Sequence, residues 1–229
     1  MREDLEQQEQ LDALKGFWQD NRWWILGLLA LIFGGWAVWA GWHAYSASQA
    51  RSANQAYGPF EQALADQNLQ AASAAAKVLF EQHGQSTQAD MAGLQLAKLQ
   101  HAAGQLEPAL VSLGHVIESK DPAMTWTARL RAAAIRIDLN QFDQALAVLA
   151  DTPPAAFEPD VLDRRGDVYA LLNRPEDART AWTTAKSKPG MNNALAALLD
   201  RKIAALGALG DTSTTGTTGP AKAQPGSAR

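Results

Sequence analysis

The sequence predicts an all-α protein, in which a single N-terminal transmembrane helix is followed by an α-solenoid of about 3–4 helical hairpins plus a C-terminal helix. Three observations support this prediction. A run of twenty residues near the N-terminus carries no charge. The region after it is rich in Ala and Leu at helical spacing, with almost no β-branched runs. A short turn motif recurs in that region at intervals of 36 and 33 residues.

The transmembrane helix is predicted over residues 23–43. The run WWILGLLALIFGGWAVWAGW, from Trp23 to Trp42, would rise about 30 Å as an α-helix, the thickness of a bilayer's hydrocarbon core. Tryptophans stand toward both of its ends, where their amphipathic rings favour the membrane interface. The lipid bilayer is therefore the first partner that the sequence predicts.

The charges that flank this run predict its orientation. Arg2, Lys15 and Arg22 precede it, whereas only Arg51 follows before Lys77. Positively charged segments stay in the cytoplasm, and acidic residues have little influence. We therefore expect a single-pass protein with a cytoplasmic N-terminus and a C-terminal domain outside, which in a bacterium means the inner membrane and the periplasm.

A cleaved signal peptide is the alternative interpretation of the apolar run. The stretch AYSASQA at 44–50 offers small residues of the kind that a signal peptidase accepts. Six acidic residues precede the run, however, unlike the short basic start of a signal peptide, and the run is longer and richer in Trp than an ordinary signal core. These features favour an uncleaved anchor.

Residues 1–22 form the predicted cytoplasmic segment. Apolar residues recur there at helical spacing and predict an amphipathic helix that leads into the membrane: Leu11, Leu14, Phe17 and Trp18. Two interpretations remain open, a helix that lies on the bilayer surface and a docking site for a cytoplasmic partner.

Small residues form one stripe along the predicted transmembrane helix. Their spacing of 3, 4, 3, 4 and 3 positions places all six on one face: Gly27, Ala30, Gly34, Ala37, Gly41 and Ala44. Such a stripe lets another helix approach closely in lipid, where packing drives association. Gly and Ala are common in membrane helices, so chance is the competing explanation. The hypothesis is that this face packs against a membrane partner or a second copy.

The remainder of the chain divides into three parts. Residues 44–59 are predicted to continue the helix as a stalk, which Gly58-Pro59 should break or kink. Residues 60–209 form the helical domain, whose short breaks predict antiparallel helices of about 10 to 18 residues. Residues 210–229 contain no apolar side chain larger than Ala and predict a disordered tail.

The recurring turn motif has the form G/N-x-Φ-x-x-A, where Φ is mostly apolar. The Gly or Asn can adopt the left-handed conformation that closes a first helix, and the small Ala lies where two helices cross. Its three copies begin and end at Gly104 and Ala109, Asn140 and Ala145, and Asn173 and Ala178. The interval is close to the 34 residues of a tetratricopeptide repeat, so the solenoid is predicted to be tetratricopeptide-like.

Further positions agree with this repeat, and others depart from it. Twelve residues before each Ala stands another small residue, namely Ala97, Ala133 or Gly166, and Gly166 with Tyr169 matches the G-x-x-Y of the consensus. The consensus Trp is not evident in register, and residues 60–83 predict at best a degenerate first repeat. Coincidental helix hairpins are the alternative. Stacked repeats of this type present a groove for peptides or partner helices and seldom catalyse.

Other classes of function find little support. The chain lacks Cys, so disulfides and a thiol nucleophile are excluded, and its net charge of −4 offers no basic stripe for nucleic acid. No catalytic or cofactor motif is present, so no enzyme activity, cofactor or metal is expected. The histidines lack metal-ligand spacing: His43, His83, His101 and His115. Asp160, Asp163 and Asp167 share a helix face, but helix-dipole and ion-pair roles, with Arg164 and Arg165 nearby, are favoured over a cation site.

The combination of these elements resembles the YfgM family of bacterial inner-membrane proteins. Three stretches carry the resemblance: QLDALKGFWQDNRW before the span, ARSANQAY after it, and LDRRGDVYALLNRPEDARTAW near the end. The resemblance implies one anchor, a periplasmic tetratricopeptide-like domain and no enzyme activity. It also implies association with the SecYEG translocon and with the periplasmic chaperone PpiD, and for some members a link to envelope stress signalling.

Three functions follow as competing hypotheses. The favoured one is an ancillary translocon subunit for protein secretion, whose repeats engage a chaperone or unfolded periplasmic clients. The second is a regulator whose N-terminal segment holds a cytoplasmic response regulator at the membrane. The third is a structural scaffold for envelope assembly.

Overall fold

The computed structural model describes residues 2–214 of the 229-residue chain, and its side chains over residues 15–207. This part of the chain contains nine α-helices, one short 3-10 helix and no strand. The chain divides into two compact units, residues 1–55 and residues 56–229. The first helix, α1 (Arg2–Ala65), supplies the described part of the first unit and the beginning of the second.

The first unit exposes its apolar side chains. Trp24 is 84% exposed, and Leu31 and Val38 are each 75% exposed. Among the described residues, α1 is the one helix that is long and apolar enough to cross a membrane, and none of its most apolar stretch is buried within the chain. These exposed side chains suit a lipid environment, which fits the predicted membrane anchor.

The break expected at Gly58-Pro59 does not occur, because α1 continues through Pro59 to Ala65. A proline inside a helix costs about 3 kcal/mol, partly through a lost backbone hydrogen bond. Gly58 has no Cβ to clash with the proline ring, which relieves part of the restriction on the preceding residue. Burial of Tyr57 and Phe60 in the core offsets the remaining cost of the proline, since one fully buried aromatic side chain contributes about 1.5–3 kcal/mol.

The chain turns instead at residues 66–68, a turn that the sequence did not predict. Gln67 has a φ of 51°, in the left-handed region, and the Asn68 N–H donates to the Ala63 carbonyl at 2.9 Å. Asn68 then caps the next helix, since its side chain accepts a hydrogen bond from the Ala71 N–H at 3.0 Å. The residues predicted as a degenerate repeat therefore form a complete hairpin.

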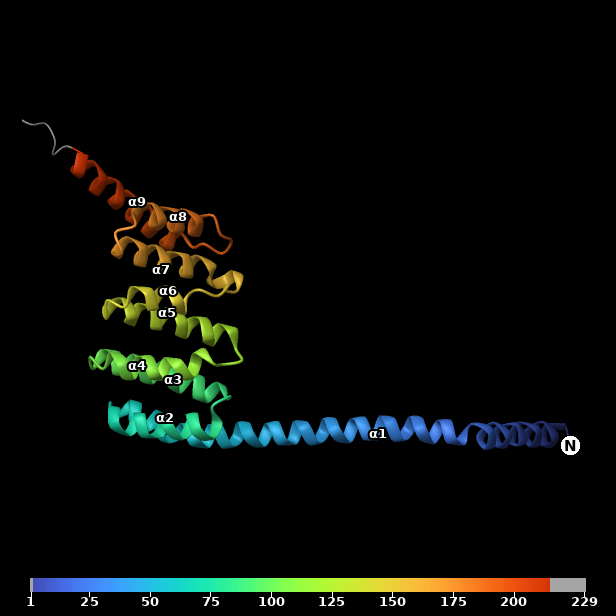
Figure 1. Ribbon diagram of the computed structural model, residues 1–229. Helices are drawn as coiled ribbons and strands as arrows, with labels where there is room; N and C mark the ends of the chain where they lie inside the picture. The colour runs from blue at the N-terminus through green and yellow to red at the C-terminus, as the bar shows by residue number, and fades with distance from the viewer. Residues whose placement is uncertain (1, 215–229) are drawn as a thin grey trace, which may run out of the picture. The chain divides into compact units, whose positions relative to one another are not determined.

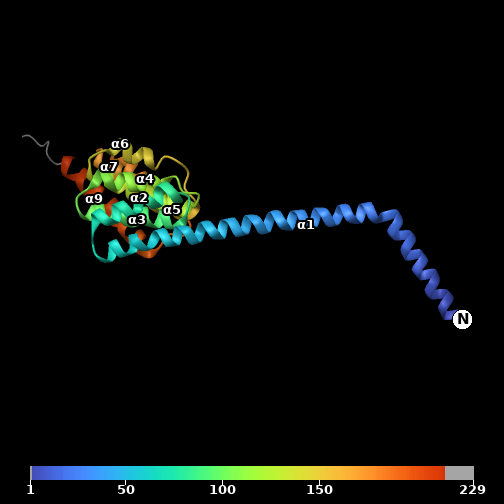
Figure 2. The ribbon, with the colours of Figure 1, turned by 90° about the horizontal axis from the view of Figure 1, so that it is seen from below.

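Four hairpins stack in chain order, followed by a single helix (Figure 1). The first joins the end of α1 to α2 (Leu69–His83), and the second joins α3 (Thr87–Ala102) to α4 (Leu106–Ile117). The third pairs α5 (Pro122–Asp138) with α6 (Phe142–Val148), and the fourth pairs α7 (Glu158–Leu171) with α8 (Pro175–Lys186). Viewed along the stack in Figure 2, α2 to α9 overlie one another. This is the predicted all-α solenoid.

The described core contains four clusters, of which three are shared between neighbouring hairpins and the fourth is shared between the last hairpin and α9. The first contains Phe60, Leu79 and Leu96, from α1, α2 and α3. The second contains Leu113 of α4 and continues into α5, and the third joins α5 to α7. The fourth links α7 and α8 to α9 (Asn193–Thr214). Because each hairpin completes the cluster of its neighbour, no hairpin buries its apolar face alone.

The ends of the elements explain several sequence features. Ser86 and Asp121 cap α3 and α5, and their side chains accept hydrogen bonds from backbone N–H groups three and two residues later. Directly after the two prolines of the stretch before α7, the chain forms the short helix η1 (Ala155–Phe157). Helix α9 extends to Thr214, into the region predicted as a tail, and residues 215–229 of that tail lie outside the described residues.

Candidate interaction surface

The turn residues of the repeat lie in the left-handed region. Gly104, Asn140 and Asn173 have φ values of 73°, 58° and 56°. In each turn, the N–H of the following residue donates to a carbonyl five residues earlier, at 2.7–2.9 Å. This is the six-to-one bond of a Schellman motif, which satisfies carbonyls at the end of the first helix. Gln67 repeats the arrangement, but Gln is not a residue that signals this conformation.

The predicted small residues are buried in the core. The Ala five residues after each turn residue is fully buried, in the first hairpin as well: Ala72, Ala109, Ala145 and Ala178. Gly166, on the partner helix, is buried, and Tyr169 packs against the fourth cluster while the Arg174 guanidinium lies 4.8 Å from its ring centroid. The repeat therefore fixes where each pair of helices touches.

Each hairpin also matches one small with one large side chain between its two helices. Ala97 faces Leu113 in the second hairpin, and Ala133 shares a cluster with Leu149 in the third. In the fourth, Gly166 faces Trp182, and a Cβ built on Gly166 would overlap the indole ring, lying 2.8 Å from its Cε2 atom. The first hairpin inverts the order, with Phe60 on the first helix and Ala76 on the second.

A pocket of about 350 Å³ opens between the first helices of the second and third hairpins. We call it the α3/α5 pocket. Its lining is mainly apolar, with three nitrogen-bearing side chains and no carboxylate: Ala97, Lys98, His101, Leu113, Arg131, Ala134 and Ile135. This size lies within the usual range for ligand sites. In the sequence, nothing distinguishes Lys98 or Arg131 from other surface cations.

A second pocket, of about 450 Å³, opens among the first helices of the third and fourth hairpins and α9. We call it the α7/α9 pocket. Its lining carries charges of both signs, from Arg164, Asp167 and Lys202, among apolar side chains that include Ile137 and Trp182. It lies on the other side of α5 from the α3/α5 pocket, because Ile135 lines one and Ile137 the other.

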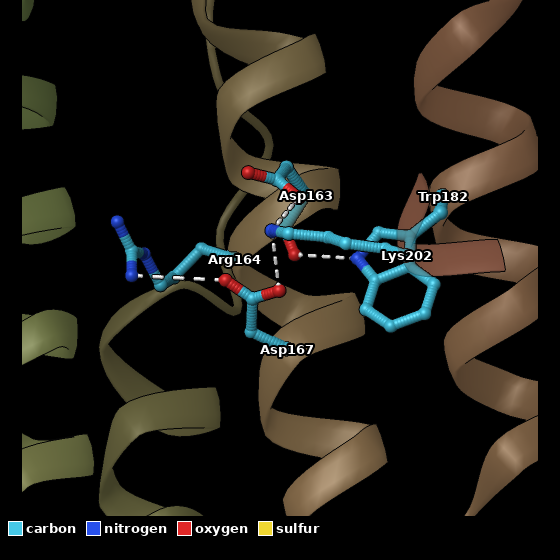
Figure 3. A network of polar contacts seen from close by, with 5 residues as sticks. All are labelled: Asp163, Arg164, Asp167, Trp182 and Lys202. Atoms are coloured by element: carbon cyan, nitrogen blue, oxygen red, sulfur yellow. Dashed lines mark hydrogen bonds and ion pairs between the residues drawn. The ribbon is translucent and has the colours of Figure 1, made fainter. Parts of the chain in front are cut away.

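The acidic residues that suggested a cation site bind an ammonium group instead. Lys202 of α9 donates to Asp163 and Asp167 of α7, at 2.6 Å each (Figure 3). Arg164 contacts Asp167 at 3.7 Å, as the ion-pair interpretation expected. Asp160 is exposed in the first turn of α7. Among the residues that the structure describes, no group of three or more acids, histidines or cysteines is arranged to hold a metal.

Trp182 completes this network. Its indole N–H donates to the Asp163 carbonyl at 3.1 Å, and the Lys202 ammonium lies 5.6 Å from its ring centroid. Burial raises the pKa of Asp167 above its ordinary value, and the hydrogen bond from Lys202 opposes that rise. The network therefore ties α9 to α7, and its key cation, Lys202, lies too far along the chain to be identified by local spacing.

The repeat register explains why the two pockets differ in charge. Counted from the buried alanines, Gln95, Arg131 and Arg164 occupy equivalent positions. One turn later the equivalent residues are Lys98, Ala134 and Asp167. Arg164 therefore has Asp167 beside it, whereas Arg131 has Ala134 and donates to the Leu94 carbonyl, at 3.1 Å.

The histidines and the small-residue stripe lie elsewhere. His101 contacts Asp138 at 3.2 Å, His115 stacks on Phe80 with ring centroids 4.2 Å apart, and His43 packs edge-on against Trp39. All six stripe residues are exposed, and a Cβ built on Gly27, Gly34 or Gly41 meets nothing within 4 Å.

Comparison with known proteins agrees with this architecture. The family model of the tetratricopeptide repeat-like domain matches residues 15–208. Two relatives are each named an ancillary SecYEG translocon subunit. The one from Neisseria gonorrhoeae (strain ATCC 700825 / FA 1090) is 27% identical over 224 residues, which cover 88% of this chain and 98% of the relative. The one from Escherichia coli (strain K12) is 27% identical over 207 residues, covering 85% and 94%. With its apolar first helix and stacked hairpins, the chain belongs to the family of tetratricopeptide repeat-like domain proteins, as a member of the YfgM family.

Proposed function

We propose that this chain is a membrane-anchored interaction subunit, ancillary to the SecYEG translocon, whose repeats hold a periplasmic chaperone such as PpiD or an unfolded client. One observation carries the proposal: a helix suited to a membrane and a stack of hairpins with open pockets occur in the same chain. The names of both relatives support the translocon, and the resemblance to the YfgM family suggests the chaperone.

The direct test is affinity purification of the full chain from detergent-solubilised membranes, followed by mass spectrometry. Translocon components should be recovered with the wild type, together with the chaperone. A chain that lacks residues 60–209 should lose the chaperone. Recovery of neither set of components with the full chain would defeat the proposal.

The orientation belongs to the same proposal, with the repeats in the periplasm. The excess of basic residues before the apolar run supports it. The absence of Cys allows a clean test, because one introduced thiol is the only one present. In intact cells with a permeable outer membrane, Ser187→Cys, at an exposed site after α8, should react with a membrane-impermeant maleimide. Asp20→Cys, at an exposed site before the span, should react only after the inner membrane is disrupted.

We also propose that the small-residue stripe packs against a membrane helix of the translocon. The spacing of its small residues along one helix face supports this role. Replacing Gly34 and Gly41 with Leu should weaken recovery of that partner. Leu28→Ala with Ile32→Ala, two exposed positions off the stripe, forms the control and should leave recovery intact. Unchanged recovery with the Leu variant would refute this role of the stripe.

A regulatory function is the second candidate, and one observation favours it. Helix α1 already includes residues 2–22, where Phe17 and Trp18 are 59% and 50% exposed, so an apolar surface is available before the span. Deleting residues 1–22 separates the two functions. Translocon association should survive the deletion, whereas binding of a cytoplasmic response regulator would vanish.

A further inference from the structure

We infer that the α3/α5 pocket binds a segment of a partner chain in which a large apolar side chain lies next to Asp or Glu. The inference rests on the proposed function, since it names the chemistry that the repeats recognise. Three properties of the pocket lead to it: an apolar floor, two cations without a carboxylate, and a contrast with the neighbouring pocket.

The floor of the pocket suits an apolar side chain. Ala97, Leu113 and Ile135 are at most 4% exposed, so they form a close-packed surface that cannot collapse further into the opening. Ala134 and Ala97 leave this space free, because a larger side chain at either position would occupy it. An apolar side chain placed here loses contact with water at little cost in polar desolvation.

The rim of the pocket suits a carboxylate. Lys98 on α3 and Arg131 on α5 line it, and neither forms an ion pair within the described part of the chain. One Arg131 nitrogen donates to the Leu94 carbonyl, which orients the guanidinium and leaves its other donors available. His101 also lines the pocket, but Asp138 contacts it at 3.2 Å. Lys98 and Arg131 are therefore the two cations that remain for a carboxylate from outside.

The α7/α9 pocket shows what this pocket lacks. There, Asp167 lies beside Arg164, and Lys202 binds both Asp163 and Asp167, so the chain neutralises its own charges. Ala134 stands in the α3/α5 pocket where Asp167 stands in α7. The chain therefore pairs the cations of the α7/α9 pocket internally, whereas in the α3/α5 pocket Asp138 pairs with His101 and leaves Lys98 and Arg131 for an anion from outside.

The same chemistry excludes nucleic acid and favours protein as the source. Two cations on a chain with a net charge of −4 neutralise too few phosphates for useful affinity. A planar guanidinium with an ammonium matches one carboxylate, and the apolar floor accepts the adjacent side chain. The occupant is thus a stretch of polypeptide that carries Asp or Glu beside Leu or a similar residue.

The test uses the full chain in detergent micelles and fluorescein-labelled, C-terminally amidated peptides, with binding measured by fluorescence anisotropy. The acidic probe is Gly-Ser-Asp-Leu-Glu-Ser-Gly. In a second probe Asn and Gln replace the two acids, and in a third Ser replaces Leu. Two exposed charge contacts predict that the acidic probe binds about five- to tenfold more tightly than the amide probe. The probe without Leu should also bind more weakly.

Variants of the protein make the inference specific. Lys98→Glu with Arg131→Glu should abolish the preference for the acidic probe, because attraction becomes repulsion. Lys77→Glu with Lys120→Glu changes the net charge equally at exposed positions outside the pocket and should leave the preference intact. Ala134→Met fills the pocket without changing charge and should weaken binding of the acidic probe.

Several outcomes would overturn the inference. These are equal binding of the acidic and amide probes, an equal loss in the control variant, or binding only when the amide probe ends in a free carboxylate. The proposed function is tested separately by co-purification. If translocon components are recovered but the acidic probe does not bind, only this inference fails. If the probe binds but no translocon or chaperone component is recovered, only the proposed function fails.

Discussion

Hairpins α5/α6 and α7/α8 share one register, yet they fill the space between their helices differently. In the first, Ala133 is matched with Leu149, and in the second, Gly166 is matched with Trp182. Their outer positions differ as well, because Arg131 is followed by Ala134, and Arg164 by Asp167. The comparison teaches that the register sets where helices touch, while pairs of residues within it set volume and charge.

Replacing the large member of the fourth pair should have the largest effect. Trp182→Ala removes a side chain that is 4% exposed, along with its hydrogen bond to the Asp163 carbonyl. Losses of buried Trp in cores cost about 3–5 kcal/mol in free energy of unfolding. Urea unfolding of the full chain in detergent, followed by circular dichroism, would measure this. A cost below about 1 kcal/mol would mean that Trp182 does not hold this hairpin.

Converting the fourth pair into the form of the third tests the comparison directly. Gly166→Ala should destabilise by about 1–3 kcal/mol, since its Cβ overlaps the indole ring. Adding Trp182→Leu should recover part of that loss, because the pair then matches Ala133 and Leu149. The double variant should cost less than the sum of the single variants by at least about 0.5 kcal/mol. Strict additivity would show that the two residues are not a matched pair.

Breaking the ion network between the fourth hairpin and α9 should cause the next largest loss of stability. Lys202→Met leaves Asp163 and Asp167 facing each other at sites 13% and 23% exposed, which should cost about 1–2 kcal/mol at neutral pH. Burial raises the pKa of Asp167 in the folded chain, and removing Lys202 raises that pKa further.

The pH dependence of the cost of Lys202→Met follows from the direction in which the pKa of Asp167 is shifted. An acid with a raised folded pKa binds protons more tightly when folded, so protonation favours the folded state as pH falls through that pKa. The cost of Lys202→Met should therefore be largest at neutral pH and shrink toward the ordinary Asp value of 3.8. Unfolding curves of both proteins across this range provide the measurement. A cost that grows on acidification would contradict the network.

Substitutions in the turns of these two hairpins should have similar effects on stability, because each turn contains an Asn in the left-handed conformation. Asn140→Ala and Asn173→Ala should each cost about 1 kcal/mol, since Ala disfavours a positive φ. Replacing either Asn with Gly should be neutral or slightly stabilising. Thermal unfolding would compare the four variants. A cost confined to one hairpin would mean that its turn is held by other contacts.

Transferring the charge pattern should have the smallest effect on stability. Ala134→Asp places in α5 the acid that α7 carries, within reach of Arg131 in the same way that Asp167 reaches Arg164. The free energy of unfolding should change by less than about 0.5 kcal/mol, because the site is only half-buried and Arg131 would pair with the new carboxylate. Binding of the acidic probe should nevertheless fall about fivefold, as measured by anisotropy, since Arg131 is then paired. Ala134→Asn is the uncharged control.

The elements were predictable where residues act locally. Apolar periodicity and Gly or Asn in turns predicted the second to fourth hairpins, because a left-handed turn depends mainly on the residue that adopts it. The first hairpin was underestimated for the same reason, since its turn residue, Gln67, gives no such signal. The break predicted at Pro59 was wrong, because the local cost of a proline inside a helix is opposed by burial of the neighbouring aromatic side chains.

The candidate site was harder to predict from the sequence than the helices. Lys98 and Arg131 are ordinary surface cations in the sequence, and only the stacking of α3 on α5 brings them to one apolar opening. The three acids of α7 had no visible partner until the docking of α9 placed Lys202 between two of them. Contacts over more than thirty residues depend on how helices pack, and local spacing does not encode that.

The sequence by itself determined that the chain has one membrane-length helix, a series of helical hairpins and a repeat register, because charge, apolar spacing and turn chemistry act over a few residues. Only the packing of the helices shows that Pro59 stays within a helix, that the first hairpin is complete, and which cations lack an anion. Those outcomes depend on burial and on distances between helices, which arise only when the hairpins stack and each completes the core of the next.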